Sequence, residues 1–167
     1  MARDFFQQSI KAAKGVGRRA VLLIGDERNL PRALPEGIIA LDYVPYQTLL
    51  PRACAVVHHG GVGTTSHALL AGVPTLIVPF AFDQSDNAEH VRKLGTSRTL
   101  YRDKYFAPRI VGELHELLKQ PFYARRAIEV GQRLKQENGP ARAADLIEQV
   151  LSGTRKPKED VVYATGD

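Results

Sequence analysis

The sequence has little of several residue types, and each shortage narrows the possible functions. Cys54 is the only cysteine among 167 residues, which excludes an internal disulfide and a cysteine-rich zinc site. A single cysteine favours a reducing compartment, so we expect a cytoplasmic protein. The longest strongly apolar run, residues 68–82, is interrupted by Gly72, Pro74 and Pro79. It is too short and too broken to form a transmembrane segment.

Aromatic residues and net charge are also low. Aromatic side chains make up 7% of the sequence, tryptophan is absent, and 23 Lys plus Arg against 18 Asp plus Glu give a net charge of +5. A nucleic-acid partner would need basic residues interleaved with stacking aromatics on one surface, so none is expected. Arg3 and Asp4 interrupt the start of the chain, so no secretory signal is expected either.

Short apolar segments alternate with segments of helical periodicity. The pattern predicts strands at residues 20–24, 37–41, 53–58, 75–78 and 96–100, and helices at residues 5–13, 64–71, 86–94, 110–118, 123–136 and 140–150. This alternation is typical of an α/β fold with a Rossmann-like, doubly wound parallel sheet, here followed by C-terminal helices. We expect one domain, residues 1–151, and a disordered tail, residues 152–167.

A segment free of charged residues carries the clearest chemical signal. Between Ala53 and Phe82 there is no Asp, Glu, Lys or Arg, and this segment contains the run His58-His59-Gly-Gly-Val-Gly-Thr64-Thr65. Glycines allow a backbone to approach a ligand closely, and the first amides of a helix have no internal partner. A strand, a glycine loop and a helix start therefore suggest a phosphate site, although an ordinary glycine-rich turn capped by threonine has the same local pattern.

Other chemistries fit this segment less well. The dinucleotide-binding glycine pattern fails at Ser66, and no lysine follows Gly63 as a Walker loop requires. Neighbouring residues of a strand point to opposite faces, so His58 and His59 are not expected to share a metal ion. The Gly-x-Ser-x-Gly motif of hydrolases is absent from the sequence.

A second polar segment follows the strand predicted at residues 75–78. In a doubly wound sheet, ligands bind beyond the carboxyl ends of the strands, so this segment should face the same crevice as the glycine loop. Asp83 and Gln84 offer acceptors and a donor suited to hydroxyl groups. Helix capping is the alternative role, and it fits Asp86 better than Asp83 because Asp86 and Glu89 have the spacing of a capping box.

Together these residues resemble the donor-binding signature of GT-B glycosyltransferases. The similarity is to the UDP-glucosyl and glucuronosyl transferase family, above all its bacterial antibiotic, macrolide and sterol relatives, and covers about residues 5–151. The motifs that carry it are Tyr43-Val-Pro45, Leu49-Leu50, His59-Gly-Gly-Val-Gly-Thr-Thr65, Ala71-Gly-Val-Pro74, Pro79, Asp83-Gln84 and Asn87-Ala88. The resemblance implies the carboxyl-terminal half of a two-domain enzyme that transfers a hexose from a nucleotide-diphosphate sugar with inversion.

The resemblance also implies roles for individual residues. His59 would contact the donor diphosphate and assist its departure, Tyr43 would stack on the base, and Asp83 with Gln84 would hold the sugar hydroxyls. His67 stands where plant members have the glutamate that binds ribose, and Tyr46 where they have glutamine, so both UDP and dTDP remain open. The implied donor-binding residues are Tyr43, His59, Gly60, Gly61, Gly63, Thr64, Thr65, His67, Asp83 and Gln84.

No catalytic base is expected within this chain. By resemblance, the base belongs to an amino-terminal acceptor-binding half, supplied in cis or in trans. Asp83 and Asp86 do not form the metal-binding Asp-x-Asp pair of the other large glycosyltransferase fold, so neither a metal nor a cofactor is expected. We expect this chain alone to be inactive.

The resemblance further implies that the first, central strand of the sheet is not among the predicted strands. Its absence would leave a gap between the strands containing Val21 and Val56. A gene fragment, a mispredicted start and a subunit completed by a partner are all compatible with this pattern. The alternatives to a transferase half are a non-catalytic nucleotide-sugar-binding subunit or truncated relic, and a nucleotide-sugar epimerase of the same fold.

Overall fold

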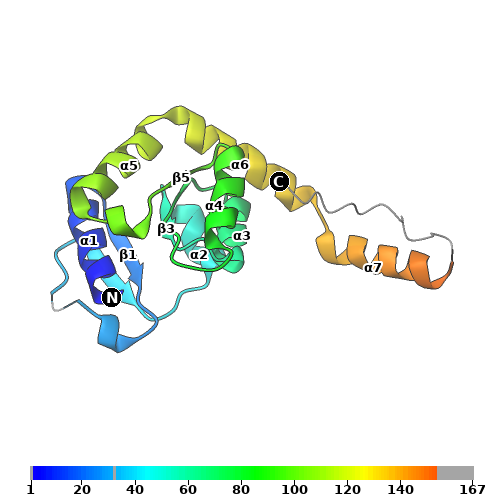
Figure 1. Ribbon diagram of the computed structural model, residues 1–167, viewed down its shortest axis with the longest axis horizontal. Helices are drawn as coiled ribbons and strands as arrows, with labels where there is room; N and C mark the ends of the chain where they lie inside the picture. The colour runs from blue at the N-terminus through cyan, green and yellow to red at the C-terminus, as the bar shows by residue number, and fades with distance from the viewer. Residues whose placement is uncertain (1, 32, 154–167) are drawn as a thin grey trace. The chain divides into compact units, whose positions relative to one another are not determined.

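The structure is a computed structural model that describes residues 2–31 and 33–153 (Figure 1). The chain divides into two compact units between Leu134 and Lys135. The first unit contains every strand of the described part of the chain and most of the helices. The predicted domain bounds of 1–151 therefore stay a prediction, and the predicted tail lies outside the described residues except for Ser152 and Gly153.

The strands of the first unit form two parallel sheets. The strands are β1 (Ala20–Leu23), β2 (Ile38–Leu41), β3 (Val56–His58), β4 (Thr75–Ile77) and β5 (Ser97–Thr99). β1 pairs with β2, and β4 lies between β3 and β5. All five predicted strands are thus present, and all pairs are parallel. The fold class is confirmed.

The two sheets are separated where the sequence predicts a gap. A doubly wound sheet of this kind has the strand order 3-2-1-4-5-6. Here β2 and β1 correspond to strands 3 and 2 of that order, and β3, β4 and β5 correspond to strands 4, 5 and 6. No strand from the described residues occupies the position of strand 1, between β1 and β3. The expected gap between Val21 and Val56 is confirmed.

Helices cover both faces of the sheets (Figure 1). The α-helices are α1 (Ala2–Gly15), α2 (Tyr46–Leu49), α3 (Val62–Ala71), α4 (Gln84–Lys93), α5 (Ala107–Lys119), α6 (Pro121–Gln136) and α7 (Gly139–Leu151). Short 3-10 helices occur at Glu27–Asn29, Leu50–Arg52 and Arg102–Lys104. α1 and α5 pack on one face, and α3 and α4 pack on the other.

Helix α1 holds the two sheets together. Its residues Ile10 and Ala13 pack with Leu22 of β1 in one apolar cluster. Ala12 of the same helix packs with Leu76 of β4 in a second cluster, which also includes residues of α5. The apolar face of a single amphipathic helix therefore contributes to both cores.

Several element boundaries differ from the sequence prediction. β3 begins at Val56 rather than at residue 53, because Leu50–Arg52 forms a 3-10 turn and pairing with β4 begins only at Val56. α3 begins at Val62 and α4 at Gln84, both two residues earlier than expected. Asp86 therefore lies within the first turn of α4, and the capping box expected for it is wrong.

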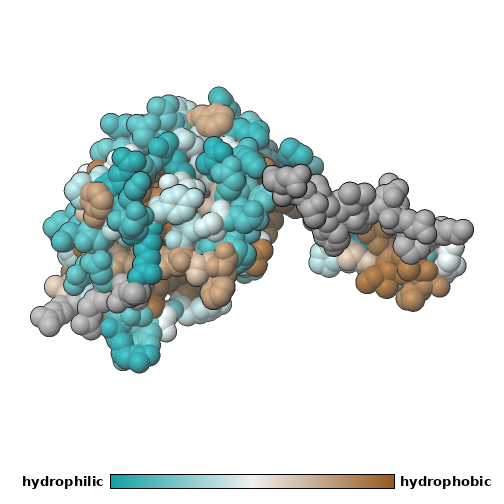
Figure 2. Space-filling view, viewed as in Figure 1, coloured by the Kyte–Doolittle hydropathy of each residue, from teal (hydrophilic) through white to brown (hydrophobic). Residues whose placement is uncertain are grey.

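The described part of the second unit consists mainly of α7. Asn138 caps this helix, since its side chain accepts a hydrogen bond from the Ala141 amide at 3.2 Å. Ile147 and Leu151 are exposed, and apolar side chains gather on the visible face of this helix in Figure 2. The α7 segment is thus amphipathic, as its sequence predicts.

Candidate functional site

The glycine loop joins the end of β3 to the start of α3. Gly60 has a φ of +91°, and a Cβ added to it would lie 2.9 Å from a methyl carbon of Ile77 and 3.0 Å from the Gln84 carbonyl oxygen. A Cβ on Gly61 would lie 2.5 Å from Nε2 of His59. Gly60 therefore requires glycine, whereas a side chain at position 61 would only require the exposed His59 ring to move.

The two histidines before this loop have different environments. His58 is buried, and its Nδ1 accepts a hydrogen bond from the Gly60 amide at 3.1 Å. Burial, with a smaller contribution from His59, lowers the pKa of His58 from 6.5 to about 4, so this ring is neutral. His59 is exposed and its ring lies against Gly61. His59 is thus the histidine that a ligand can reach.

Helix α3 presents its amino terminus directly after the loop. Gly61 is the N-cap residue, and no side chain caps the helix. The first amides of the helix, from Val62 onward, have no partner within the helix and are oriented along its axis. The helix dipole adds attraction for an anion of roughly 0.3–1 kcal/mol, and about 2 kcal/mol in a partly buried geometry. Gly63 faces open space, so the backbone there is accessible to a phosphate-sized group.

Asn87 connects the glycine loop to the second polar segment. Its side-chain amide donates to the Gly60 carbonyl at 3.0 Å and to the Asp83 carboxylate at 2.8 Å. Gly60 also approaches the backbone of Gln84 closely. The starts of α3 and α4 are therefore neighbours, as expected for segments that follow adjacent parallel strands.

Asp83 and Gln84 offer complementary groups at the start of α4. Asp83 is exposed, and one of its carboxylate oxygens is held by Asn87. The side-chain oxygen of Gln84 accepts hydrogen bonds from the Phe80 and Ala81 amides at 2.8 and 3.1 Å. Gln84 thereby fixes the loop after β4, and its amide nitrogen remains the donor that a hydroxyl group could meet.

A second group of predicted residues lies across the carboxyl ends of β1 and β2. Tyr43 is 80% exposed and lines a cavity of about 460 Å³ together with His67. Tyr46 stands between this cavity and α3: its ring meets His67 edge to face at 5.4 Å, and its hydroxyl lies 3.5 Å from the Thr64 hydroxyl. An exposed aromatic ring over a partly apolar cavity is a suitable platform for a planar base.

The structure brings the predicted residues to the carboxyl ends of the strands, but the side chain of Thr65 is not accessible there. The Thr65 hydroxyl is buried and has no hydrogen-bond partner in the described part of the chain. In this arrangement it faces away from solvent, so a direct contact with a phosphate would require a different side-chain position. Thr64, which is half-buried and contacts Tyr46, is better placed.

Three features of the site did not appear among the predicted site residues. Asn87 forms the central link, and its position one helical turn after Asp83 is the signal that could have indicated it. Tyr46 positions His67 and Thr64. Phe82 is 96% exposed with a φ of +59°, a strained conformation that no sequence pattern indicates.

The residues present also bear on metal and membrane binding. Within residues 2–31 and 33–153, no three His, Cys, Asp or Glu side chains converge as they would around a metal ion. No helix in these ranges is both long enough and apolar enough to cross a membrane.

Comparisons with known proteins agree with this fold. The family described as "Erythromycin biosynthesis protein CIII-like, C-terminal domain" matches residues 13–150. O-mycaminosyltylonolide 6-deoxyallosyltransferase of Streptomyces fradiae is 33% identical over 147 residues, covering 87% of this chain and 34% of that protein. Elloramycin glycosyltransferase ElmGT of Streptomyces olivaceus is 41% identical over 120 residues, covering 71% of this chain and 29% of that protein.

A solved structure shows the same similarity. The crystal structure of the glycotransferase of kitacinnamycin matches with a TM-score of 0.77 and 32% identity, covering 87% of this chain and 38% of that one. The fold and these similarities thus define the C-terminal, donor-binding domain of a GT-B glycosyltransferase. This chain belongs to the erythromycin biosynthesis protein CIII-like C-terminal domain family, and it spans about a third of the length of these relatives.

Proposed function

We propose that this chain binds the donor of an inverting glycosyltransferase that transfers a hexose from a nucleotide-diphosphate sugar to an acceptor hydroxyl. The observation that supports the proposal most strongly is the Asn87 link, which puts the uncapped start of α3 beside Asp83 and Gln84. A diphosphate at the helix start would place its sugar toward those two polar side chains. The residues we assign to the donor are Tyr43, His59, Gly60, Gly61, Gly63, Thr64, His67, Asp83 and Gln84, with Thr65 contributing its backbone.

The proposed site acts on the leaving group. As the bond between sugar and phosphate breaks, negative charge grows on the departing diphosphate. The first amides of α3, the Thr64 hydroxyl and His59 would stabilise this charge more in the transition state than in the ground state. These groups supply the stabilisation that a metal ion provides in other enzymes, so we propose a metal-independent reaction.

The proposal divides the enzyme between two halves. The base that deprotonates the acceptor would come from an acceptor-binding half, in cis or in trans, since His58 is buried with a pKa lowered to about 4, and we assign His59 to the diphosphate. The isolated chain should therefore bind the donor without transferring its sugar. Release of the nucleotide diphosphate by purified chain, given a nucleotide sugar and a panel of acceptor alcohols, would contradict this division.

Nucleotide binding provides the first test. The melting temperature of the purified chain is measured with UDP, dTDP and GDP, since a ligand that binds only the folded state raises it by mass action. We expect UDP or dTDP to raise it, and we expect His59→Ala to reduce the shift. If none of the three nucleotides shifts the wild-type transition, the donor site is wrong.

A pair of glycine variants separates binding from stability. Gly63 and Gly112 both lie in helices, and a Cβ added to either meets nothing within 4 Å. Gly63→Ala would occupy the space proposed for the phosphates, whereas Gly112→Ala, on α5, would not. We expect only Gly63→Ala to weaken nucleotide binding. Equal binding by the two variants would place the phosphate elsewhere.

A further inference from the structure

Helix α6 meets the carboxyl end of α3 through backbone atoms. A Cβ added to Gly131 of α6 would lie 2.8 Å from the Leu69 carbonyl oxygen and 3.0 Å from Cα of Gly72, the C-cap residue of α3. A Cβ added to Gly72 would in turn lie 3.3 Å from Cα of Ile128 in α6. The two glycines therefore let the backbones of α6 and of the α3 end come into direct contact.

This contact lies beyond the end of α3, along the helix axis. The carbonyl groups of an α-helix point toward its carboxyl terminus, roughly parallel to the axis. The Leu69 carbonyl belongs to the last turn of α3, so it points out of the helix end and toward Gly131. Because α3 has 10 residues, this end is about 15 Å from the start of the helix. Helix α6 thus stops α3 at the end opposite the proposed phosphate site.

Helix α6 is itself held in place before it reaches α3. The Tyr123 hydroxyl accepts a hydrogen bond from Arg98 of β5 at 3.0 Å. The Arg126 guanidinium donates to the C-cap carbonyl of α4 at 3.3 Å, and Ala127 is completely buried. These contacts fix the first turns of α6 on β5 and α4. A displacement at Gly131, one turn after Ala127, therefore falls on α3 more readily than on α6.

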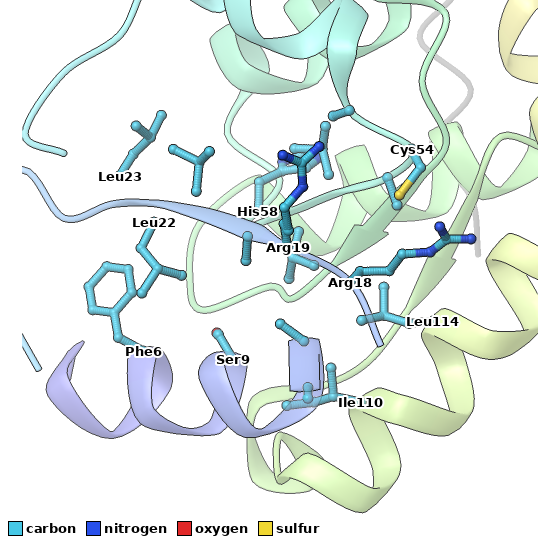
Figure 3. A pocket seen from close by; sticks show the side chains of 18 of the residues that line it. Phe6, Ser9, Arg18, Arg19, Leu22, Leu23, Cys54, His58, Ile110 and Leu114 are labelled. Atoms are coloured by element: carbon cyan, nitrogen blue, oxygen red, sulfur yellow. The ribbon is translucent and has the colours of Figure 1, made fainter. Parts of the chain in front are cut away.

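The start of α3 has more room than its end. His59 and Thr64 line a cavity of about 1310 Å³ between the two sheets, and Figure 3 shows His58 at the border of this cavity. A Cβ added to Gly63 meets nothing within 4 Å among the described residues. A helix that is stopped at one end and has room at the other should transmit a displacement along its axis to its first amides.

We propose that Gly131 is a positioning residue for the donor diphosphate: the close approach that it allows sets the axial position of α3, and with it the position of the first amides of this helix. The inference rests on the proposed function, because it concerns the same diphosphate site. Carbon atoms ordinarily contact carbonyl oxygens at about 3.3–3.6 Å, so a methyl group at position 131 would displace α3 by about half an ångström. The nucleoside would be affected less, because Tyr43, the proposed platform for the base, lies outside α3.

Calorimetric titration of three proteins tests the role of Gly131. The wild type, Gly131→Ala and Gly112→Ala are each titrated with UDP, uridine, dTDP and thymidine. Gly112 is the matched control, since it also lies within a helix but a Cβ added to it meets nothing within 4 Å among the described residues. Gly131→Ala should weaken binding of the diphosphate about three- to tenfold and of its nucleoside less than about twofold. Gly112→Ala should leave both affinities unchanged.

The ratio of the two affinities separates positioning from a loss of stability. Partial unfolding lowers the affinities for the diphosphate and for the nucleoside by the same factor, so a merely structural role of Gly131 leaves their ratio unchanged. If the wild type prefers the diphosphate and Gly131→Ala keeps that preference, the donor site stands and the inference about Gly131 is wrong. If the wild type itself shows no preference, the proposed phosphate site is wrong, and the inference fails with it.

A second measurement uses only the wild type, so it stands even if Gly131→Ala fails to fold. Coupling between two sites is reciprocal, so a diphosphate that binds the start of α3 should also affect the contact at its end. In ¹H–¹⁵N spectra, the amide signals of Gly72 and Gly131 should shift more with the diphosphate than with its nucleoside, whereas the Gly112 signal should not distinguish the two ligands. Equal shifts of Gly72 and Gly131 with both ligands would overturn the inference.

Discussion

Strands β1 and β4 have similar apolar sequences but different surroundings. β4 lies between β3 and β5, and its residues Leu76 and Ile77 are completely buried. β1 has one neighbouring strand among the described residues, and Val21 in it is 38% exposed. An apolar sequence therefore predicts that a segment can form a buried strand. Whether the strand is in fact buried depends on having a neighbouring strand on each side.

The largest difference in unfolding free energy is expected between variants that truncate one side chain in each of these two strands. Leu76→Ala should lower the free energy of unfolding by about 2–5 kcal/mol, because it opens a cavity in a fully packed core. Val21→Ala should cost about 1 kcal/mol or less, because that side chain is already partly hydrated. Urea unfolding monitored by circular dichroism measures both. Equal losses would mean that β1 is as well packed as β4.

His58, buried at the end of β3, should make stability depend on pH. Its pKa is lowered by burial from 6.5 to about 4, so below pH 6.5 the unfolded chain binds a proton that the folded chain does not. Stability should therefore fall as the pH decreases from 6.5 to about 4, by about 3 kcal/mol in total. His58→Leu should remove this contribution. The test is to measure the free energy of unfolding against pH for the wild type and for this variant. The same pH dependence of the unfolding free energy in both proteins would contradict a buried, neutral His58 ring.

The glycine loop beside β4 should be sensitive to a single methyl group. Gly60→Ala would force a residue with a side chain into a φ of +91° and against the Gln84 carbonyl. We expect a loss of about 1–3 kcal/mol in the free energy of unfolding, measured by thermal or urea denaturation. A neutral effect would mean that the loop can move away from α4.

The smallest changes in unfolding free energy are expected from substitutions of the two helical glycines, Gly63 and Gly112. Gly63→Ala and Gly112→Ala should each change the free energy of unfolding by at most about 1 kcal/mol, in the stabilising direction, because alanine favours a helix over glycine. Denaturation of the two variants side by side measures this. A strong destabilisation by Gly63→Ala would show that its open side is filled by protein, and would undermine its use as a probe of the phosphate site.

Much of the fold could be predicted from the sequence because the apolar patterns are strong. The strand at residues 20–24 and the helix at residues 110–118 agree with the structure within a few residues, whereas the position of the gap was expected from the resemblance to the family. The start of α3 could not be located from composition. The hydroxyl cluster at Thr64 looks like a cap, yet the helix begins at Val62, where the loop backbone sets the N-cap at Gly61.

The candidate site was predictable in its residue types but not in its hydrogen bonds. The positions of His59 and Asp83 after neighbouring strands indicated that they share a crevice. The dual contact of Asn87 and the use of the Gln84 oxygen by the loop backbone depend on side-chain directions that a linear pattern does not contain. The same is true of Thr65, whose hydroxyl faces the interior.

Calorimetric titration tests the central claim most directly, since it compares a nucleoside diphosphate with its own nucleoside. UDP against uridine, and dTDP against thymidine, differ only in the diphosphate that we assign to the start of α3. In at least one of the two pairs, the diphosphate should bind at least about tenfold more tightly than the nucleoside, and Gly63→Ala should remove most of that difference. Equal affinities for the diphosphate and the nucleoside in both pairs would contradict the account.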